Sequence, residues 1–415
     1  MLLSLKIDNY KGVKREINIS SIASNKIKRS NNDTSKIADN VKLLKNICLI
    51  GSNASGKTSI LSAIETLQAF LMFPYRKKIT NEKDYADFIE NMSPEELKKF
   101  LIKFNTLELG EQNNLRKKEK TTIEIELYIP KRKNNIPGIY KYTLLYKDDY
   151  SKNGVLMEKL EYKKSINSKS KIIGLGNNII ESEISTAILY ENNDSKNNEI
   201  SIFVDYFKTF FDEMIDYTSC IDKKAGANLF DIIKKNKEQF LSLTNIADEK
   251  IINITIDENN DKPQILFWNS NNTYLTFSQL SSGTKKVIIL GSILLESLEN
   301  NSLVLIDEIE LSLHPSLATF LINLNVSKDC NHFSQLIFTT HSPFVAFSLS
   351  NDQLYYINNK DEQYNVSNIN SAIKNGIITK DKSPQKAWLE DLLIKNPDIN
   401  KINNFLKINK ETRQT

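Results

Sequence analysis

The segment Gly51-Ser-Asn-Ala-Ser-Gly-Lys-Thr has the residue types and spacing of a phosphate-binding loop. Its glycines permit a tight turn whose backbone N–H groups surround phosphate oxygens at the start of a helix. Lys57 can then reach the β- and γ-phosphates of a nucleoside triphosphate, and the Thr58 hydroxyl can bind Mg²⁺. The residues predicted to contact the nucleotide here are Gly51, Asn53, Ala54, Ser55, Gly56, Lys57, Thr58 and Ser59.

Two acidic residues follow the apolar run in "LVLIDE". Asp307 is placed to bind Mg²⁺ through its carboxylate oxygens. Glu308 is the candidate base that orients or deprotonates the attacking water. Taken alone, this segment could be a solvated pair of acids at a strand end, but together with the phosphate loop it indicates a hydrolytic nucleotide site.

The three histidines receive different interpretations. His341 directly follows the apolar run in "LIFTTHSPF", where a neutral imidazole could contact the γ-phosphate and the attacking water, so we predict a catalytic role rather than a structural one. His314, in "ELSLHP", could line a dimer face or cap the next helix, and the sequence leaves both readings open. His332 lies in a polar turn and is predicted to be exposed.

The turn "LSSGTKK", residues 280–286, precedes an apolar helix and by itself would be explained as an N-cap. The turn lies shortly before "LVLIDE", and "TTH" follows further along the chain. In this context the turn resembles the signature motif of ABC-type ATPases. In that family, the turn binds the γ-phosphate of ATP held by the opposite subunit. The resemblance places Ser281 and Gly283 on the serine and second glycine of the motif, with Ser282 between them as a further nucleotide-binding candidate.

Taken together, these motifs resemble the SMC/RecF-like branch of ABC-type ATPases, and most closely the stand-alone bacterial ATP-binding proteins of abortive infection and anti-phage defence. The resemblance covers residues 1–75 and 250–358 well and the middle only in outline. It implies that ATP and Mg²⁺ are bound, that ATP is hydrolysed, and that a homodimer or higher homo-oligomer forms around ATP. It also implies a separate effector, a nuclease or toxin. The Q-loop glutamine is not placed, with Gln112 and Gln239 as candidates.

The elements that must position these residues follow from hydrophobic periodicity. Alternating residues predict an N-terminal hairpin and an antiparallel meander over 122–164, and a polar stretch predicts a loop over 25–40. Helical spacing predicts helices over 60–73, 94–104 (after a Ser93-x-x-Glu96 capping box), 200–215 and 227–243. Buried strands that alternate with helices indicate a largely parallel sheet with helices on its faces. With the resemblance above, we predict an α/β fold of the ABC-type (SMC/RecF-like) P-loop ATPase class, with a mixed central sheet, an antiparallel β subdomain and a helical insertion.

The predicted organisation has four parts. Residues 1–75 and 251–358 form the two halves of the ATPase lobe, 76–250 form the β meander and the helical insertion, and 359–415 form a C-terminal tail with possible partner-binding helices near 385–395 and 399–408.

Composition is that of an ordinary globular protein, and its nearly balanced charge neither indicates nucleic-acid binding nor excludes a local basic patch. The 55 basic and 51 acidic residues give a net charge of +4, and hydrophobic residues make up 40%. Cys48, Cys220 and Cys330 fit no metal-ligand spacing and suggest buried thiols in a reducing compartment. No apolar run approaches a membrane span. We therefore predict a cytoplasmic protein without membrane contact.

Three other functions would each need features that the sequence can reveal. A DNA-repair or DNA-end-binding ATPase would need a basic groove, for which the runs at 116–120 and 131–133 are candidates, so nucleic acid is a possible partner. An OLD-type nuclease would need a TOPRIM domain with clustered acids, for which the chain after His341 is too short. A transporter ATPase is disfavoured by the long insertion between phosphate loop and signature turn.

Overall fold

The computed structural model of the 415-residue chain describes the following residues: 1–11, 13, 16–25, 27, 33–53, 55–72, 120–130, 137–147, 155–176, 215–216, 225–258, 263–326, 333–360, 363–379, 383–390 and 392–393. The Ser93 capping box, Gln112, Cys220, Cys330, His332, the basic run at 131–133 and the predicted helix at 399–408 lie outside them.

The main sheet has six strands in the order β10-β14-β15-β5-β16-β17. Their bounds are β10 (Ile215–Asp216), β14 (Leu303–Ile306), β15 (Gln335–Thr340), β5 (Asn46–Gly51), β16 (Leu354–Lys360) and β17 (Gln363–Asn368). All pairs are parallel except β16 with β17. Strands β14, β15 and β5 are buried along their whole length, which explains their continuous apolar runs. Since these three are parallel, the residues that follow them meet at one edge of the sheet.

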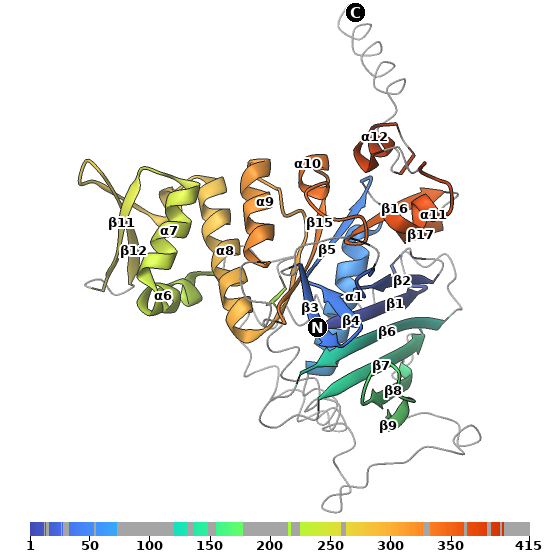
Figure 1. Cartoon of the computed structure of the whole chain (residues 1–415). Coiled ribbons are helices and arrows are strands. Elements are labelled where there is room, and N and C mark those ends of the chain that lie inside the picture. Colours follow the sequence, from blue (N-terminus) through green and yellow to red (C-terminus); the bar gives the residue numbers. More distant parts are fainter. Residues whose placement is uncertain are drawn as a thin grey trace, which may run out of the picture.

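Three helices cover one face of this sheet, and one helix and a second sheet pack on the other face (Figure 1). Helices α8 (Ser282–Asn300), α9 (Pro315–Leu324) and α10 (Pro343–Ala346) share a core with alternate residues of β5, β14 and β15. The remaining residues of these strands pack with α1 (Lys57–Met72) and the second sheet. The phosphate loop therefore joins a strand and a helix that are both fixed in the core.

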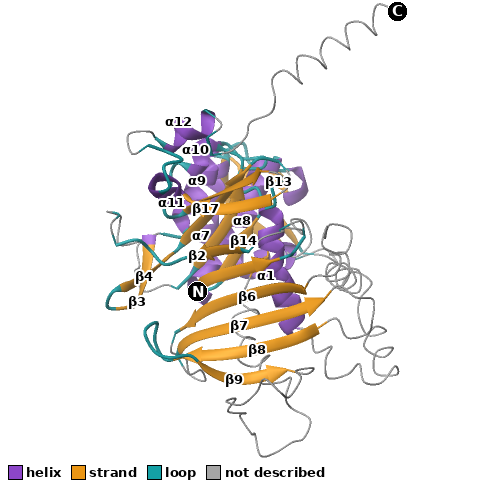
Figure 2. Ribbon diagram, turned by 90° about the vertical axis from the view of Figure 1, so that its right-hand side faces the viewer, coloured by secondary structure: helices purple, strands orange, loops and turns teal. Residues whose placement is uncertain are grey.

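The second sheet is antiparallel, with the order β2-β1-β6-β7-β8-β9 (Figure 2). Its strands are β2 (Ile17–Ser20), β1 (Leu2–Asp8), β6 (Lys120–Ile129), β7 (Gly138–Lys147), β8 (Val155–Lys163) and β9 (Lys171–Gly176). In β6 each second residue is buried, so one face packs on the core and the other meets solvent. The predicted N-terminal hairpin and meander are both confirmed.

A group of elements extends the molecule beyond α8, at the left of Figure 1. It comprises α6 (Ala225–Lys235), α7 (Lys237–Ala247), β11 (Ile251–Asp257), β12 (Gln264–Asn269), β13 (Tyr274–Thr276) and the 3₁₀ turn Phe277–Gln279. Asn236 caps α7 by accepting the Gln239 N–H at 3.2 Å and so divides the predicted helix 227–243 into two. With the two larger sheets, these helices confirm the predicted fold class of a mixed central sheet, an antiparallel β subdomain and a helical insertion.

Two predictions of local structure are wrong. Residues 34–38 form strand β3 (Thr34–Ala38), paired with β4 (Val41–Leu44), where we predicted a loop over 25–40. Ile215 and Asp216 form β10, parallel to β14, where we predicted that a helix over 200–215 ends at Ile215; residues 200–214 are not described. Both segments are strands because they pair with a neighbouring strand, and local periodicity does not show this pairing.

The chain after residue 358 also contributes to the main sheet. Strand β16 crosses the predicted lobe boundary and β17 follows it, with α11 (Ile369–Lys374) beside them. Helix α12 (Pro384–Leu389) lies in the segment where we predicted a helix near 385–395, and Trp388 packs in the core. Among the helices of the described residues, none is long and apolar enough to cross a membrane.

Candidate nucleotide site

The phosphate loop has a geometry that two glycines make possible. A Cβ at Gly51 would lie 2.3 Å from the Ser55 Oγ and 3.0 Å from the Ile357 carbonyl oxygen, which leaves no room for a side chain. Gly56 has φ +93°, in the region that favours glycine. The loop is therefore fixed between β16 and the first turn of α1. Ala54, predicted to contact the nucleotide, lies outside the described residues.

The Lys57 ammonium lies folded over this loop. Its Nζ donates to the carbonyl oxygens of Gly51 at 3.0 Å and Ser52 at 2.9 Å. Burial lowers the pKa of Lys57, while Asp307, Glu308 and other nearby carboxylates act in the opposite direction. The strand ends thus bring the acids close enough to influence this lysine, as the motifs predict.

Asp307 joins the first turn of α1 to the end of β15. Its Oδ2 accepts a hydrogen bond from the Thr58 Oγ1 at 2.8 Å, and its Oδ1 accepts one from the Thr339 Oγ1 at 2.5 Å. Among the described residues, no group of three or more His, Cys, Asp or Glu side chains could hold a metal ion. One hydroxyl and one carboxylate are nevertheless a donor set that suits Mg²⁺, which commonly keeps waters and takes its other oxygens from phosphates.

Glu308 has a backbone conformation that is unfavourable for its residue type. Its φ is +48°, in the left-handed region that side chains other than glycine rarely adopt. Its N–H donates to the Thr339 Oγ1 at 2.7 Å. Its carboxylate Oε1 lies 3.7 Å from the His341 Nε2, and the side chain is 45% exposed, so solvent reaches it. A water can therefore approach the predicted base.

The His341 ring lies beside the Glu308 carboxylate, 3.7 Å away. Burial and, next, the charge of Lys57 lower the pKa of His341, although Glu310 and Glu308 oppose this. These effects together favour the neutral imidazole, the form in which we predict that His341 acts. Its backbone N–H donates to the Glu310 Oε1 at 2.5 Å.

Three residues at the site were not predicted from the sequence: Thr339, Glu310 and Lys286. Thr339 was visible as the first threonine of "TTH", and Glu310 as the third acid of "IDEIE". The Glu310 Oε2 is buried and has no hydrogen-bond partner among the described residues. Lys286 is only 6% exposed and donates to the Glu308 carbonyl oxygen at 3.1 Å. No pattern in the sequence marks this lysine as buried.

The signature turn lies apart from the phosphate loop of its own chain. Ser281 caps α8, with its Oγ accepting the Thr284 N–H at 3.0 Å. A Cβ at Gly283 would lie 3.0 Å from the Ser312 carbonyl oxygen, so this glycine packs closely on the turn after the two acids. Within the described part of the chain, no hydrogen bond joins residues 281–283 to the phosphate loop.

The remaining candidates have structural partners. The Ser59 Oγ donates to the Lys11 carbonyl oxygen at 3.2 Å, which ties α1 to the N-terminal hairpin. The Ser55 Oγ is buried without a hydrogen-bond partner in the described residues, whereas Asn53 is exposed. The His314 Nδ1 accepts the Ser316 N–H at 3.3 Å, so this histidine caps α9. Gln239 lies on α7 and hydrogen-bonds with Asn236, away from the acids.

Comparison with known families identifies this arrangement. The family model described as "AAA domain, putative AbiEii toxin, Type IV TA system" matches residues 47–347, which is more than half of the chain. The range contains the phosphate loop, the signature turn, the two acids and His341, and the predicted SMC/RecF-like ABC-type ATPase class is confirmed. No curated protein matches the chain.

Solved structures similar to this chain include SMC head domains. The SMC head domain from Thermotoga maritima has 11% identity and a TM-score of 0.41, with 88% of this chain and 98% of that chain covered. An SMC head bound to the C-winged helix domain of ScpA has 13% identity and a TM-score of 0.46, with 90% and 99% covered. The Smc head domain with an extended coiled coil, bound to the C-terminal domain of ScpA derived from Pyrococcus furiosus, has 10% identity and a TM-score of 0.45, with 90% and 98% covered.

Proposed function

Since this chain belongs to the AAA-domain family of the putative AbiEii toxin type, we propose that it binds ATP with Mg²⁺ and hydrolyses it as a switch. The observation that carries the proposal is the junction of Thr58, Asp307 and Thr339 through two short hydrogen bonds. It joins the loop that would bind phosphate to the strand end that bears the base. A solvated pair of acids would not make these contacts.

Each residue of the site has a role that its position supports. Lys57 leaves the loop carbonyls and binds the β- and γ-phosphate oxygens, while the loop N–H groups bind the phosphates. Thr58 and Asp307 would hold Mg²⁺, which when bound neutralises charge on the phosphate oxygens. Glu308 accepts a proton from the attacking water, and neutral His341 donates to a γ-phosphate oxygen through its Nε2. Glu308 and His341 are close enough to contact the same water.

We further propose that two copies of the chain sandwich two ATP molecules. The Ser281 Oγ is already satisfied within α8, while the free N–H groups at the start of this helix can bind an anion. A second subunit would bring these groups to the γ-phosphate. Binding of ATP would then bring two subunits together, and hydrolysis would release them.

The cellular role that we propose is control of an anti-phage, abortive-infection system in the cytoplasm. The family description names a toxin of a type IV toxin–antitoxin system, and the motifs resemble stand-alone ATPases of such systems. In this proposal the ATP-dependent dimer controls a separate effector, a nuclease or toxin. An affinity pulldown from the native host, followed by mass spectrometry, identifies that effector.

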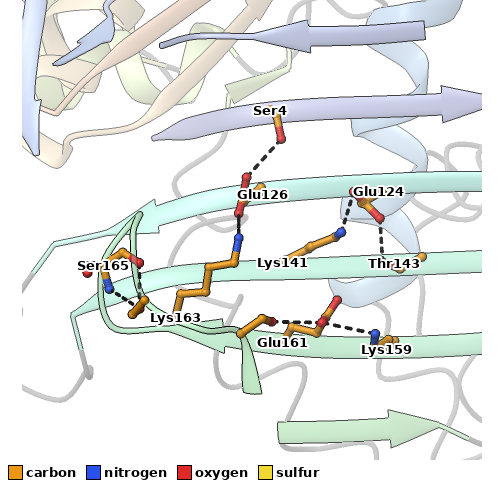
Figure 3. A network of polar contacts seen from close by, with 11 residues as sticks. Ser4, Glu124, Glu126, Lys141, Thr143, Lys159, Glu161, Lys163 and Ser165 are labelled. Carbon is orange, nitrogen blue, oxygen red and sulfur yellow. Dashed lines mark hydrogen bonds and ion pairs between the residues drawn. The ribbon is translucent and has the colours of Figure 1, made fainter. Parts of the chain in front are cut away.

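A DNA-binding role receives less support from the open face of the antiparallel sheet. Figure 3 shows that lysines on this face point toward glutamates of the same face. Lys141 lies 2.9 Å from Glu124, and Lys163 lies 2.9 Å from Glu126. The paired charges do not form the basic groove that phosphate binding requires. Salt-dependent binding of DNA by the purified protein would favour the alternative.

The proposed function is tested with Glu308→Gln. We expect the ATP hydrolysis rate to fall by about 10²- to 10⁴-fold, because the amide cannot accept the proton from water. ATP binding should persist, and an ATP-bound dimer should accumulate on size-exclusion chromatography. Glu249→Gln, at an exposed position before β11, is the control. Hydrolysis by Glu308→Gln at the wild-type rate would show that the base is another residue.

A further inference from the structure

Lys286 connects the helix of the signature turn to the backbone of the predicted base. It lies in the second turn of α8, and its side chain is buried against the segment that follows β14. Its Nζ donates to the Glu308 carbonyl oxygen at 3.1 Å. The ammonium does not contact the Glu308 carboxylate, the Lys57 side chain or the phosphate loop through any hydrogen bond within the described residues. It acts on the backbone of Glu308 rather than on the reacting atoms.

The segment that Lys286 holds needs external support. Both Glu308 and Ser312 have positive φ, +48° and +62°, although neither is glycine. This conformation is unfavourable for a residue with a Cβ, so the surroundings must hold it in place. The Thr339 hydroxyl, at the end of β15, accepts the Glu308 N–H at 2.7 Å. Lys286, on α8, donates to the carbonyl oxygen of the same residue.

A second contact joins the same two elements. Gly283, within the signature turn, approaches the Ser312 carbonyl oxygen so closely that a Cβ there would be only 3.0 Å away. The start of α8 therefore contacts both ends of the strained segment 308–312. Lys286 contacts Glu308, and Gly283 contacts Ser312. A displacement of α8 cannot leave this segment unchanged.

We propose that Lys286 is a positioning residue that fixes the Glu308 backbone and couples it to the signature helix. The inference rests on the proposed function. In a dimer, the start of α8 in one subunit would meet the ATP held by its partner. A movement of α8 at that contact would change the position of Glu308 through Lys286, within the subunit that carries this α8. This Glu308 acts on the ATP that its own subunit holds. Occupation of one site thereby promotes hydrolysis at the second.

The test compares Lys286→Met, Lys286→Arg and wild type. Methionine fills the buried space without a donor, so we expect kcat to fall at least about tenfold, because a misplaced catalytic group is costly. KM and the affinity for a fluorescent ATP analogue should stay within about twofold, since Lys286 does not contact nucleotide. The Hill coefficient for ATP should fall to about one. Arginine, which keeps the charge and the donor, should restore much of kcat.

Lys285→Met is the matched control, because Lys285 is the neighbouring lysine but donates outward to the Ser278 carbonyl oxygen. If Lys286→Met does not fold, Lys286→Gln takes its place, because glutamine retains a polar group in the buried position. We then expect the same result, a lower kcat with KM within about twofold of wild type. An unchanged kcat, or a change in KM alone, overturns the inference while wild-type hydrolysis upholds the proposed function. A wild-type protein that hydrolyses no ATP overturns both.

Discussion

At the scale of single residues, the site depends on side chains that hold the catalytic candidates in place. Thr339 donates to Asp307 and accepts from the Glu308 N–H, so one hydroxyl orients both acids. Glu310 accepts the His341 N–H with one carboxylate oxygen and leaves the other buried. The catalytic candidates are therefore held by residues that do not themselves reach the phosphate.

The lowered pKa of His341 predicts how the free energy of unfolding depends on pH. Its pKa is lowered in the folded protein, with burial as the largest cause, so the folded state binds fewer protons than the unfolded state below about pH 6.5. The stabilisation is therefore complete above that pH and is lost as pH falls through 6.5 toward the lower folded-state pKa. His341→Gln should lose less unfolding free energy than wild type between pH 7.5 and 5.5, as measured by urea denaturation at both values. Equal losses would contradict the shift.

At the scale of elements, parallel strands and one close helix contact set the arrangement. The ends of β14, β15 and β5 bring Asp307, His341 and the phosphate loop to one edge of the sheet. The helix α8 carries the signature turn and packs on α7 through Gly291. The position of the signature turn thus depends on how closely these two helices approach.

The contact at Gly291 can be tested by a double-mutant cycle. A Cβ at this position would lie 2.5 to 3.0 Å from three atoms of the Leu243 side chain. We expect Gly291→Ala to destabilise the protein by about 1–3 kcal/mol through overpacking. In a Leu243→Ala background, the same change should cost less, because the new methyl group enters the vacated space. Urea denaturation of the four proteins checks this, and additive losses would show that Leu243 moves freely aside.

At the scale of the whole molecule, the nucleotide site that we propose is complete only with a second copy. Figure 1 shows α8 on one side of the main sheet and α1 among the elements on the other, so the two phosphate-facing helix starts come from different layers. One chain then supplies half of each of two sites. Two inactive variants with defects in opposite halves should therefore complement each other.

Lys57→Ala and Ser281→Asp provide this test. Aspartate keeps the helix cap but repels the γ-phosphate, so each variant alone should hydrolyse ATP poorly. In an equal mixture, half of the dimers would be mixed and each would hold one intact site, so up to about a quarter of the wild-type rate should return, and less where hydrolysis needs the second site occupied. Recovery is measured after mixing and exchange, with each variant alone as the control. No recovery would mean that Ser281 acts on its own chain.

The sequence by itself determined the phosphate loop, the two acids, His341, the N-terminal hairpin and the meander. These features depend on short spacing and local periodicity, which the chain carries in neighbouring residues. The family match over residues 47–347 agrees with the class that they indicate.

Only the tertiary structure decided which side chains support them. Strand β10 replaced part of a predicted helix because Ile215 pairs with Val304, far along the chain. Thr339 lies beside Asp307, and Lys286 beside Glu308, because separate strands and a helix meet at one sheet edge. Such contacts depend on packing between distant segments, and hydrophobic periodicity records which face of an element is buried but not what it is buried against.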